Sequence, residues 1–244
     1  MALSAWLLIA LAGLAIGATS IGGVLVVPAL HGWLGYPIID ATAVSSQAFF
    51  WTGLWALWRL PRMGLELMRR EGPWLVAALC GAVLGAWLGG WVPAPWIRAW
   101  VGILALTSGL YGLWRAQGAA TLANDTWPSA PMQMLMGTLV GVGSAMSGTG
   151  GPVMLLPLLM LWRCELARSV QLALVIQLPI ALAATATHSA AGRLDLGTGL
   201  LVAVVLLASA ELGRRLSRHW PARVLQTVTA VLLLGTGLWM FSLG

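Results

Sequence analysis

TSIGGVLVVP, residues 19–28, and SGTGGPVMLLP, residues 147–157, decide how this chain folds. Each is a patch of glycine and hydroxyl residues inside an otherwise apolar stretch, followed by a short apolar run and a proline. Glycine permits dihedral angles outside the helix and loses the most entropy within one, so each patch predicts a break between two half-helices. Pro152 suits the first turn of the second half-helix, where no main-chain N–H is needed. Inside a membrane such breaks are tolerated only where they are buried in protein or line a cavity, so both are candidate binding sites.

The composition is that of a membrane protein. Hydrophobic residues make up 59% of the chain and charged residues only 8%, against roughly 25% charged in a soluble domain. All 13 basic residues are arginines, and they sit at the ends of apolar segments. We therefore interpret them as topology signals and not as a nucleic-acid surface. The apolar segments hold no cluster of carboxylates, histidines or cysteines, so we expect no metal and no cofactor.

Eight long apolar segments are predicted, against the ~20 residues that one membrane crossing needs. Their approximate bounds are Leu3–Trp33, Ile39–Trp58, Pro73–Val92, Pro95–Arg115, Met132–Trp162, Leu166–Ala190, Leu196–Arg215 and Pro221–Phe241. The first and fifth contain the glycine breaks and suit two half-helices better than one straight span. Tryptophans at the segment ends are expected to anchor the protein at the membrane interface. They are Trp58, Trp91, Trp96, Trp100, Trp114, Trp162 and Trp220, whereas Trp51 and Trp55 lie inside a segment.

The two halves of the chain repeat at an offset of 128 residues. Gly85 matches Gly213, and Pro93 matches Pro221. We predict a first transmembrane repeat over residues 1–115, a linker over 116–131 and a second repeat over 132–244. The repeat also keeps a stripe of small residues, which lets helices approach closely in lipid. The stripe comprises Gly81, Gly85 and Gly89 in the first half and Ser209, Gly213 and Ser217 in the second.

The arginines decide between two topologies. If all eight segments crossed the membrane, one side would hold six arginines and the other seven, with no bias. If the first and fifth segments are re-entrant, eleven arginines lie on one side and two, Arg98 and Arg193, on the other. The second arrangement obeys the positive-inside rule and predicts six full spans, two re-entrant hairpins and both termini outside. Each half then crosses an odd number of times, so the fold class is an all-α polytopic membrane protein of two inverted repeats.

The breaks predict a site for a small anion. No charged side chain lies in the centre of any segment, and half-helix N-termini offer free N–H groups and a positive dipole end. Two inverted hairpins would aim two such ends at one point. Hydroxyls at the breaks and amides of the flanking segments would add donors, although helix–helix hydrogen bonding is an alternative role for each. The candidate substrate-binding residues are Thr19, Ser20, Gly22, Gly23, Gln47, Ser147, Gly148, Thr149, Gly150, Gly151, Gln171 and Gln177. His188 is the candidate for proton coupling, and a structural histidine is its alternative.

The pattern resembles the TauE/SafE family of membrane transporters. The two glycine blocks carry the resemblance, together with HSAAGRLDL at residues 188–196 and ELGRRL at residues 211–216. The first block has fewer glycines than is usual in the family, and Pro152 stands where a third glycine is common. The resemblance implies export of sulfite or an organosulfonate across a bacterial cytoplasmic (inner) membrane. The implied partners are a small anion, the lipid bilayer and a proton, with a homodimer left open.

Other functions are weaker readings of the same residues. An anion channel would need a continuous polar lining, whereas polarity is concentrated at the two breaks. An intramembrane serine hydrolase would pair Ser147 with His188, but the glycine expected two residues before such a serine is missing. A structural or sensory membrane protein would leave two matched breaks unexplained. We therefore expect no enzymatic activity.

Overall fold

The computed structural model describes residues 2–59, 61–117 and 127–242. Within those residues the chain is all-helical, with 84% helix and no strand, which confirms the expected all-α class of polytopic membrane protein. The helices are α1 (Ala2–Thr19), α2 (Val26–Gly32), α3 (Ile38–Arg59), α4 (Pro61–Arg70), α5 (Gly72–Gly89), α6 (Ala94–Ala116), α7 (Ala130–Ser147), α8 (Pro152–Leu161), α9 (Leu166–Ala190), α10 (Leu196–Leu216) and α11 (Ala222–Ser242), with a 3₁₀ turn, η1 (Gly23–Leu25), before α2. Most of the predicted linker lies outside the described residues.

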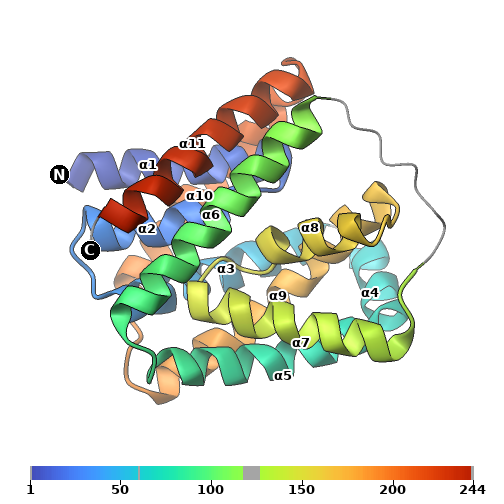
Figure 1. Ribbon diagram of the computed structural model, residues 1–244, viewed down its shortest axis with the longest axis horizontal. Helices are drawn as coiled ribbons and strands as arrows, with labels where there is room; N and C mark the ends of the chain where they lie inside the picture. The colour runs from blue at the N-terminus through green and yellow to red at the C-terminus, as the bar shows by residue number, and fades with distance from the viewer. Residues whose placement is uncertain (1, 60, 118–126, 243–244) are drawn as a thin grey trace.

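Both broken segments form hairpins, as Figure 1 shows. The first hairpin starts with α1 and finishes with α2 at the same end of the bundle, where both termini also lie. We call this the termini end. α7 and α8 begin and end at the opposite end, next to α4, which we call the α4 end. This geometry agrees with the re-entrant alternative. The internal repeat and the side of the membrane on which each end lies remain predictions.

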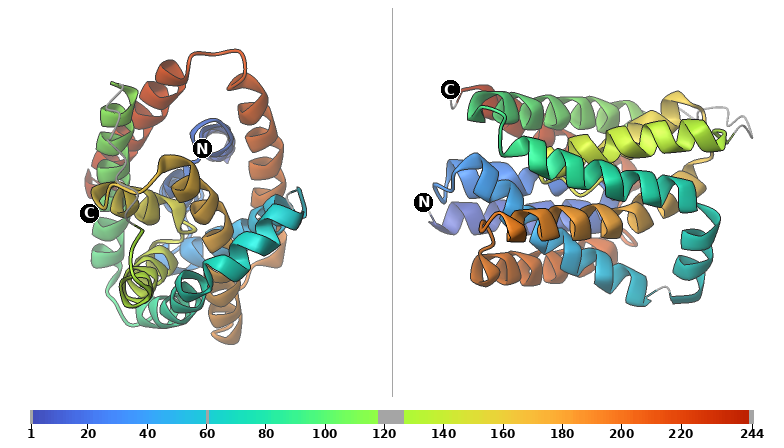
Figure 2. Two further views of the ribbon diagram at one scale, coloured as in Figure 1. Left: turned by 90° about the vertical axis from the view of Figure 1, so that its right-hand side faces the viewer. Right: turned by 90° about the horizontal axis from the view of Figure 1, so that it is seen from below.

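Five of the described helices are long and apolar enough to cross a membrane: α5, α6, α9, α10 and α11. The sixth predicted span, α3, also runs from the termini end to the α4 end (Figure 2), but it is not among these five. Its polar residues Thr42, Ser45, Ser46 and Gln47 are buried in protein. The polar first half of α3 therefore faces other helices and not lipid, whereas Trp51, Leu54 and Trp58 in its second half are exposed.

Small residues bring three pairs of helices into close contact. A Cβ atom on Gly109 of α6 would lie 2.9 Å from the carbonyl oxygen of Ala230 on α11, and one on Gly237 would lie 3.0 Å from that of Gly102. Gly85 of α5 packs in the same way on Val142 of α7. The predicted stripe also packs at Gly213, where α10 meets α1 at Leu14. The packing role of the small residues is thus confirmed at these positions.

The helix α1 packs on α10, and α7 packs on α5, so the hairpin of each half lies against a long helix of the other half. α3 and α9 also pack on each other, and they contact α2 and α8 respectively. Of the predicted interfacial tryptophans, all are exposed except Trp100. The Trp100 indole N–H instead donates to the carbonyl oxygen of Gly143 at 3.0 Å, so this residue joins α6 to α7.

Candidate functional site

The first break is ordered by its own polar groups. The Thr19 hydroxyl donates to the carbonyl oxygens of Ala15 at 2.8 Å and Ile21 at 3.0 Å, which closes the last turn of α1. Ser20 follows with φ +63°, a left-handed conformation that is costly for a residue with a side chain. A Cβ atom on Gly22 would lie 2.8 Å from the carbonyl oxygen of Ala12, so the chain can turn back against α1 only with glycine at this position.

The second break uses three glycines in the positive-φ region. Gly148, Gly150 and Gly151 have φ values of +63°, +80° and +105°, which other residues rarely adopt. Gly148 ends α7, and α8 begins at Pro152 as the sequence predicts. The Ser147 hydroxyl donates to the carbonyl oxygen four residues earlier at 2.8 Å and lies 2.9 Å from the Thr149 Oγ1. The local hydroxyls therefore bind the main chain and each other.

The two breaks meet in the centre of the protein. A Cβ atom on Gly23 would lie 2.8 Å from the carbonyl oxygen of Thr149, so the two hairpin tips are in main-chain contact. The Phe49 ring packs against both breaks, at 2.8 Å from that Cβ position on Gly23 and 3.0 Å from the one on Gly150. Phe49 is only 2% exposed. The point at which both half-helices meet is therefore packed with an aromatic ring.

The helices α3 and α9 bind the breaks with polar side chains. The Ser45 hydroxyl donates to the carbonyl oxygen of Gly148 at 2.6 Å. The Gln177 amide donates to the carbonyl oxygen of Phe49 at 3.2 Å and to the Thr52 hydroxyl at 2.8 Å. Gln177 therefore links α9 to α3, and its Cα atom lies 4.0 Å from the position of a Cβ atom on Gly151 of the second break.

The other two predicted glutamines lie elsewhere. The Gln47 amide donates to the carbonyl oxygen of Leu196 at 3.4 Å and packs against Gly199, near the start of α10. Its Oε1 has no hydrogen-bond partner among the described residues. Gln171 lies six residues before Gln177 on α9 and is half-buried. No described contact brings Gln47 or Gln171 to a break.

A cavity of about 640 Å³ leads from the first break to the α4 end. Ser20, Thr52 and Gln177 lie at its deep end, and Arg214 and Arg218 at the end of α10 lie at its mouth. The wall between them is largely apolar and is built from four helices. It contains Ile16, Gly17, Trp55, Ala56, Leu174, Leu206, Leu207 and Ala210. Three hydrogen-bonding side chains and two guanidiniums thus share one cavity with apolar sides.

The arginines at the mouth differ in their pairing. Arg214 binds Glu211 with two hydrogen bonds, of 3.0 and 2.6 Å. Arg215 also pairs with Glu211, four residues before it, at 3.1 Å. Arg218 is exposed, and no ion pair to a described residue is found for it. Two arginines, Arg214 and Arg218, therefore line the mouth, and of these only Arg214 is paired with a described carboxylate, which leaves the mouth positively charged and favourable to anions.

His188 is 1% exposed, and both of its ring nitrogens are without a hydrogen-bond partner among the described residues. The hydrolase alternative requires a hydrogen bond from Ser147 to this ring, but the Ser147 hydroxyl binds within its own break. The described residues also contain no group of histidines, cysteines and carboxylates that could hold a metal ion.

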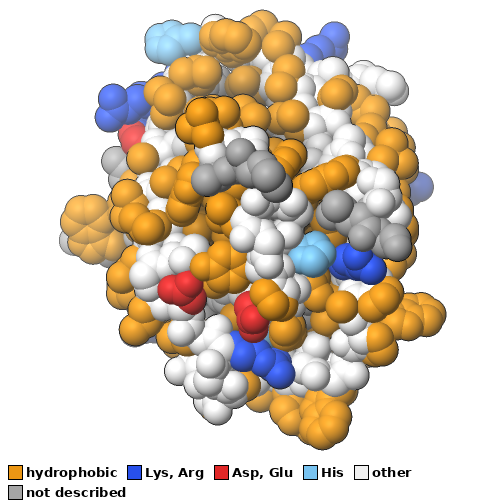
Figure 3. All heavy atoms as spheres, turned by 90° about the vertical axis from the view of Figure 1, so that its left-hand side faces the viewer, with side chains coloured by type: hydrophobic (Ala, Val, Ile, Leu, Met, Phe, Trp, Pro, Cys, Tyr) orange, Lys and Arg blue, Asp and Glu red, His pale blue; other side chains and the backbone are white. Residues whose placement is uncertain are grey.

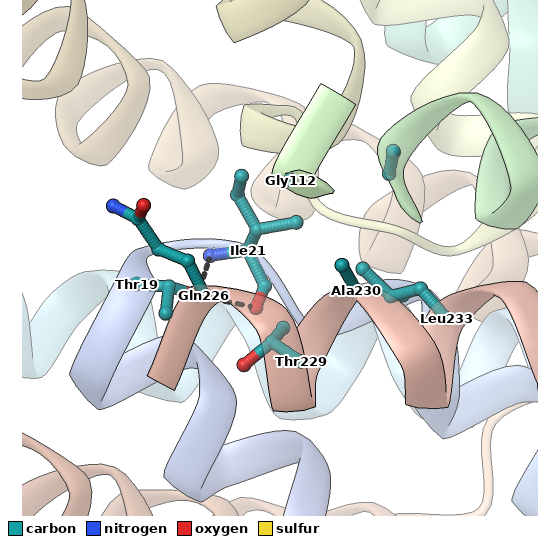
Figure 4. Close-up of a pocket in the computed structure, with 8 residues that line it drawn as sticks. Thr19, Ile21, Gly112, Gln226, Thr229, Ala230 and Leu233 are labelled. Atoms are coloured by element: carbon teal, nitrogen blue, oxygen red, sulfur yellow. Dashed lines mark hydrogen bonds between the residues drawn. The ribbon is translucent and has the colours of Figure 1, made fainter. Parts of the chain in front are cut away.

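A much smaller cavity of about 10 Å³ lies behind the first break, between α1, α6 and α11 (Figure 4). The labelled Thr19 and Ile21 are joined there by their hydrogen bonds, and Gly112, Gln226 and Thr229 line the same space. This volume is about what one water molecule needs, so the small cavity has no room for an oxyanion.

Four residues of this region escape the sequence reasoning: Phe49, Thr52, Arg214 and Arg218. The two arginines were counted as topology signals, and a repeated arginine on one face of a segment end was the available clue. Nothing in the sequence marks Phe49 as the ring that fills the space between the breaks. Trp55, singled out because it lies inside a segment, does line the cavity.

Comparison with curated proteins and with solved structures finds no match. The family model described as Sulfite exporter TauE/SafE matches residues 3–240, which is nearly the whole chain. The residues that carry the site all fall within this match. The chain, with its two broken hairpins and its arginine-lined cavity, belongs to the TauE/SafE family of sulfite exporters.

Proposed function

We propose that the protein is a secondary transporter that exports a small sulfur-containing anion, either sulfite or an organosulfonate, by alternating access. Membership of the exporter family supports transport of this class of anion. The observation that carries the proposal is the cavity that joins Ser20 and Gln177 to Arg214 and Arg218. A guanidinium at the mouth attracts the anion, and hydroxyl and amide donors at the deep end replace part of its hydration shell.

The break residues have two roles in this proposal. Ser20 and Gln177 contact the anion directly, together with Thr52, because their side chains line the cavity. The remaining break residues, including Thr19, Gly22, Ser147 and Thr149, hold the two hairpin tips together. The N-terminus of α8 is covered by Phe49, which packs against Gly150, so the anion reaches that end only when this ring moves.

Alternating access is favoured over a channel by the packing of the centre. The cavity is lined by Ser20 and by Thr52 of α3. One turn before Thr52 on α3, the Phe49 ring is buried between the two breaks. A channel needs a continuous water-filled path, whereas this centre is in van der Waals contact. Since the cavity opens at the arginine-rich α4 end, the positive-inside rule assigns the structure to an inward-open state.

A proton is the proposed coupling ion, and His188 is the proposed carrier. Its ring is buried and makes no hydrogen bond to a described residue, so either nitrogen can accept or release a proton without breaking one. Replacing His188 with Gln should abolish the dependence of transport on a pH gradient and leave sulfite exchange at equal pH intact. If a pH gradient still drives sulfite transport by the His188→Gln variant, His188 has only a structural role. A homodimer stays a prediction, and native mass spectrometry measures it.

The central test compares two neighbouring arginines in proteoliposomes. Arg218→Gln removes a charge from the cavity, whereas Arg215→Gln removes the same charge from an exposed position outside it. We expect the KM for sulfite or sulfoacetate to rise about tenfold in Arg218→Gln, which is about 1.4 kcal/mol of lost binding. Arg215→Gln should stay within twofold of the wild type. Equal effects of the two variants, or none, would refute the cavity as the anion site.

A further inference from the structure

A second cavity, of about 510 Å³, lies at the opposite end of the bundle, between the ends of α5 and α9. Trp87, Gly90 and Trp91 line it from α5 and the turn after it, and Thr187 and Arg193 line it from α9 and the loop that follows. Figure 3 views this end and shows isolated charged side chains on a largely apolar surface. Arg193 is the one charged residue among the described residues that line the cavity.

The main chain fixes the position of Arg193. Gly192, two residues after the end of α9, has φ +69°. The Gly192 N–H donates to the carbonyl oxygen of Ser189 at 2.9 Å, and the Arg193 N–H donates to the carbonyl oxygen of His188 at 3.0 Å. These are the two hydrogen bonds of a Schellman motif, a rigid helix ending. The Arg193 side chain then reaches α5, because a Cβ atom on Gly90 would lie 3.0 Å from the Nη1 atom. The Arg193 main chain is therefore fixed by the helix ending, and its guanidinium is packed against Gly90.

The Arg193 guanidinium keeps its hydrogen-bonding capacity. In the described part of the chain, no hydrogen bond or ion pair uses it. Trp87 and Trp91 stand beside it, with ring centroids 6.0 Å apart and planes at 57°. A guanidinium has five N–H donors in a planar fork that matches an oxyanion, and each indole adds one N–H. The chemistry of this cavity therefore suits a sulfur or phosphorus oxyanion.

The two cavities occupy matching positions of the predicted repeat. At the offset of 128 residues, Arg214 corresponds to Ala86 and Arg218 to Gly90, and both pairs line their respective cavities. At the α4 end the guanidinium comes from α10 itself. At the termini end the equivalent positions are alanine and glycine, and the space above Gly90 is taken by the guanidinium of Arg193. At both ends of the bundle an arginine guanidinium thus lies at equivalent positions of the predicted repeat. At one end it comes from the end of α10, and at the other it comes from the loop after α9.

We propose that Arg193, Trp87 and Trp91 form a second oxyanion site at the termini end. This inference rests on the proposed transport function, since an exported anion must leave through that end. The ligand is an oxyanion such as sulfite or a sulfonate, and the phosphate of a lipid headgroup shares the same chemistry. The Trp87 and Trp91 rings are exposed at the predicted membrane interface, so both sources can reach the guanidinium.

The test measures sulfite binding by calorimetry to the full chain in nanodiscs of neutral phosphatidylcholine. The wild type should bind two sulfite ions per chain, and Arg193→Gln and Arg218→Gln should each bind one. Arg98→Gln, which removes an arginine from the same end outside the cavity, should bind two. Loss of binding in Arg193→Gln with no effect of Arg218→Gln would refute the proposed transport site and keep the second site. The reverse result would refute the second site alone.

A second arm identifies the source of the oxyanion. The same measurements are repeated in nanodiscs that contain phosphatidylglycerol. If this lipid removes one sulfite ion from the wild type but none from Arg193→Gln, a lipid phosphate occupies the site in the membrane. If it removes none, the site takes the free anion. Equal stoichiometry for wild type and Arg193→Gln in both lipids would overturn the proposal.

A conservative variant guards against loss of the fold. Arg193→Lys keeps the charge but loses the planar fork, so sulfite binding at the second site should weaken about tenfold and not disappear. External sulfite added to oriented proteoliposomes should also inhibit export, with a half-inhibitory concentration raised about tenfold by Arg193→Gln. Inhibition that is unchanged in both Arg193 variants would also count against the site.

Discussion

The carbonyl oxygen of Thr149 lies 2.8 Å from the position that a Cβ atom on Gly23 would take. These residues are at the tips of the two hairpins, which come from opposite ends of the bundle (Figure 1). The contact joins the two halves of the chain at their centre, and the Phe49 ring seals it from the side. Small changes at this point should therefore alter both stability and transport.

Gly23→Ala is expected to lower the melting temperature, because the added methyl would clash with the Thr149 carbonyl oxygen and the Phe49 ring. Overpacking of this kind costs about 1–3 kcal/mol. Gly235→Ala in α11 is the matched control, since no atom lies within 4 Å of its added Cβ. Thermal unfolding in detergent should show a decrease for the first variant and no decrease for the second. Equal melting temperatures would show that the hairpin tips are not in contact in solution.

Two variants of Ser20 distinguish the effect of backbone strain from that of substrate binding. Its φ of +63° is costly for serine, by about 1–2 kcal/mol relative to glycine. Ser20→Gly relieves the strain and removes the hydroxyl, whereas Ser20→Ala removes the hydroxyl and keeps the strain. We expect Ser20→Gly to melt at a higher temperature than Ser20→Ala, and both to raise the KM for the anion to the same extent. If the KM follows the melting temperature instead, Ser20 acts only through the backbone.

Glu71 is a buried carboxylate that ties the two halves together at the α4 end. It is 1% exposed, accepts a hydrogen bond from the Arg168 Nε at 3.0 Å and accepts another from the Trp127 indole N–H at 3.1 Å. The Arg168 guanidinium also lies 3.5 Å from the centroid of the Trp127 ring. Arg168→Gln should lower the stability by about 3 kcal/mol, because the buried Glu71 charge then keeps only Arg70, an exposed partner whose Nε lies 3.8 Å away.

The double variant Glu71→Gln with Arg168→Gln should recover part of this loss, since no charge then stays buried. The exposed pair of Arg215 with Glu211 provides the control, and its removal should cost less than about 1 kcal/mol. Unfolding free energies of the single and double variants form the thermodynamic cycle. A double variant that is less stable than Arg168→Gln would contradict the argument.

Asp195 should make the termini end sensitive to acid. Its side chain caps α10 by accepting the Thr198 N–H at 3.0 Å, and it accepts the Tyr36 hydroxyl at 2.8 Å. The hydrogen bonds from Thr198, and then that from Tyr36, hold the pKa of this carboxyl below its usual value of 3.8. A lowered carboxyl pKa gives stability that is fully present above pH 3.8 and is lost as the pH falls through the folded-state value.

Asp195→Ala should therefore cost about 1 kcal/mol at neutral pH, the usual value of a helix cap. The difference in unfolding free energy between wild type and variant should shrink below pH 3.8, where the wild-type carboxyl becomes protonated. Asp195→Asn, which can still cap the helix, should fall between the two. A difference that grows as the pH falls would contradict the assigned pKa direction.

The sequence by itself determines the membrane character, the approximate bounds of the long apolar helices and the two hairpins, whereas it does not predict the helix α4. Apolar length, glycine and proline act locally, so TSIGGVLVVP and SGTGGPVMLLP predict breaks that the structure contains. Arginine positions could select the re-entrant arrangement because charges avoid the membrane interior wherever they lie in the chain. Period and composition do not show which neighbour covers a polar face, so the burial of Thr42, Ser45 and Ser46 of α3 against other helices is seen only in the structure.

Only the tertiary structure decides which residues share a cavity. Gln177 and Gln47 are both glutamines inside apolar segments. In the structure, however, Gln177 shares a cavity with Ser20 of the first break, whereas Gln47 lies at the start of α10. Phe49 fills the space between the breaks, and Arg218 turns towards a cavity that α1, α3, α9 and α10 build together. These contacts join residues more than a hundred positions apart. They depend on how helices of both halves pack, and that packing is fixed by the sum of many weak contacts which no local pattern records.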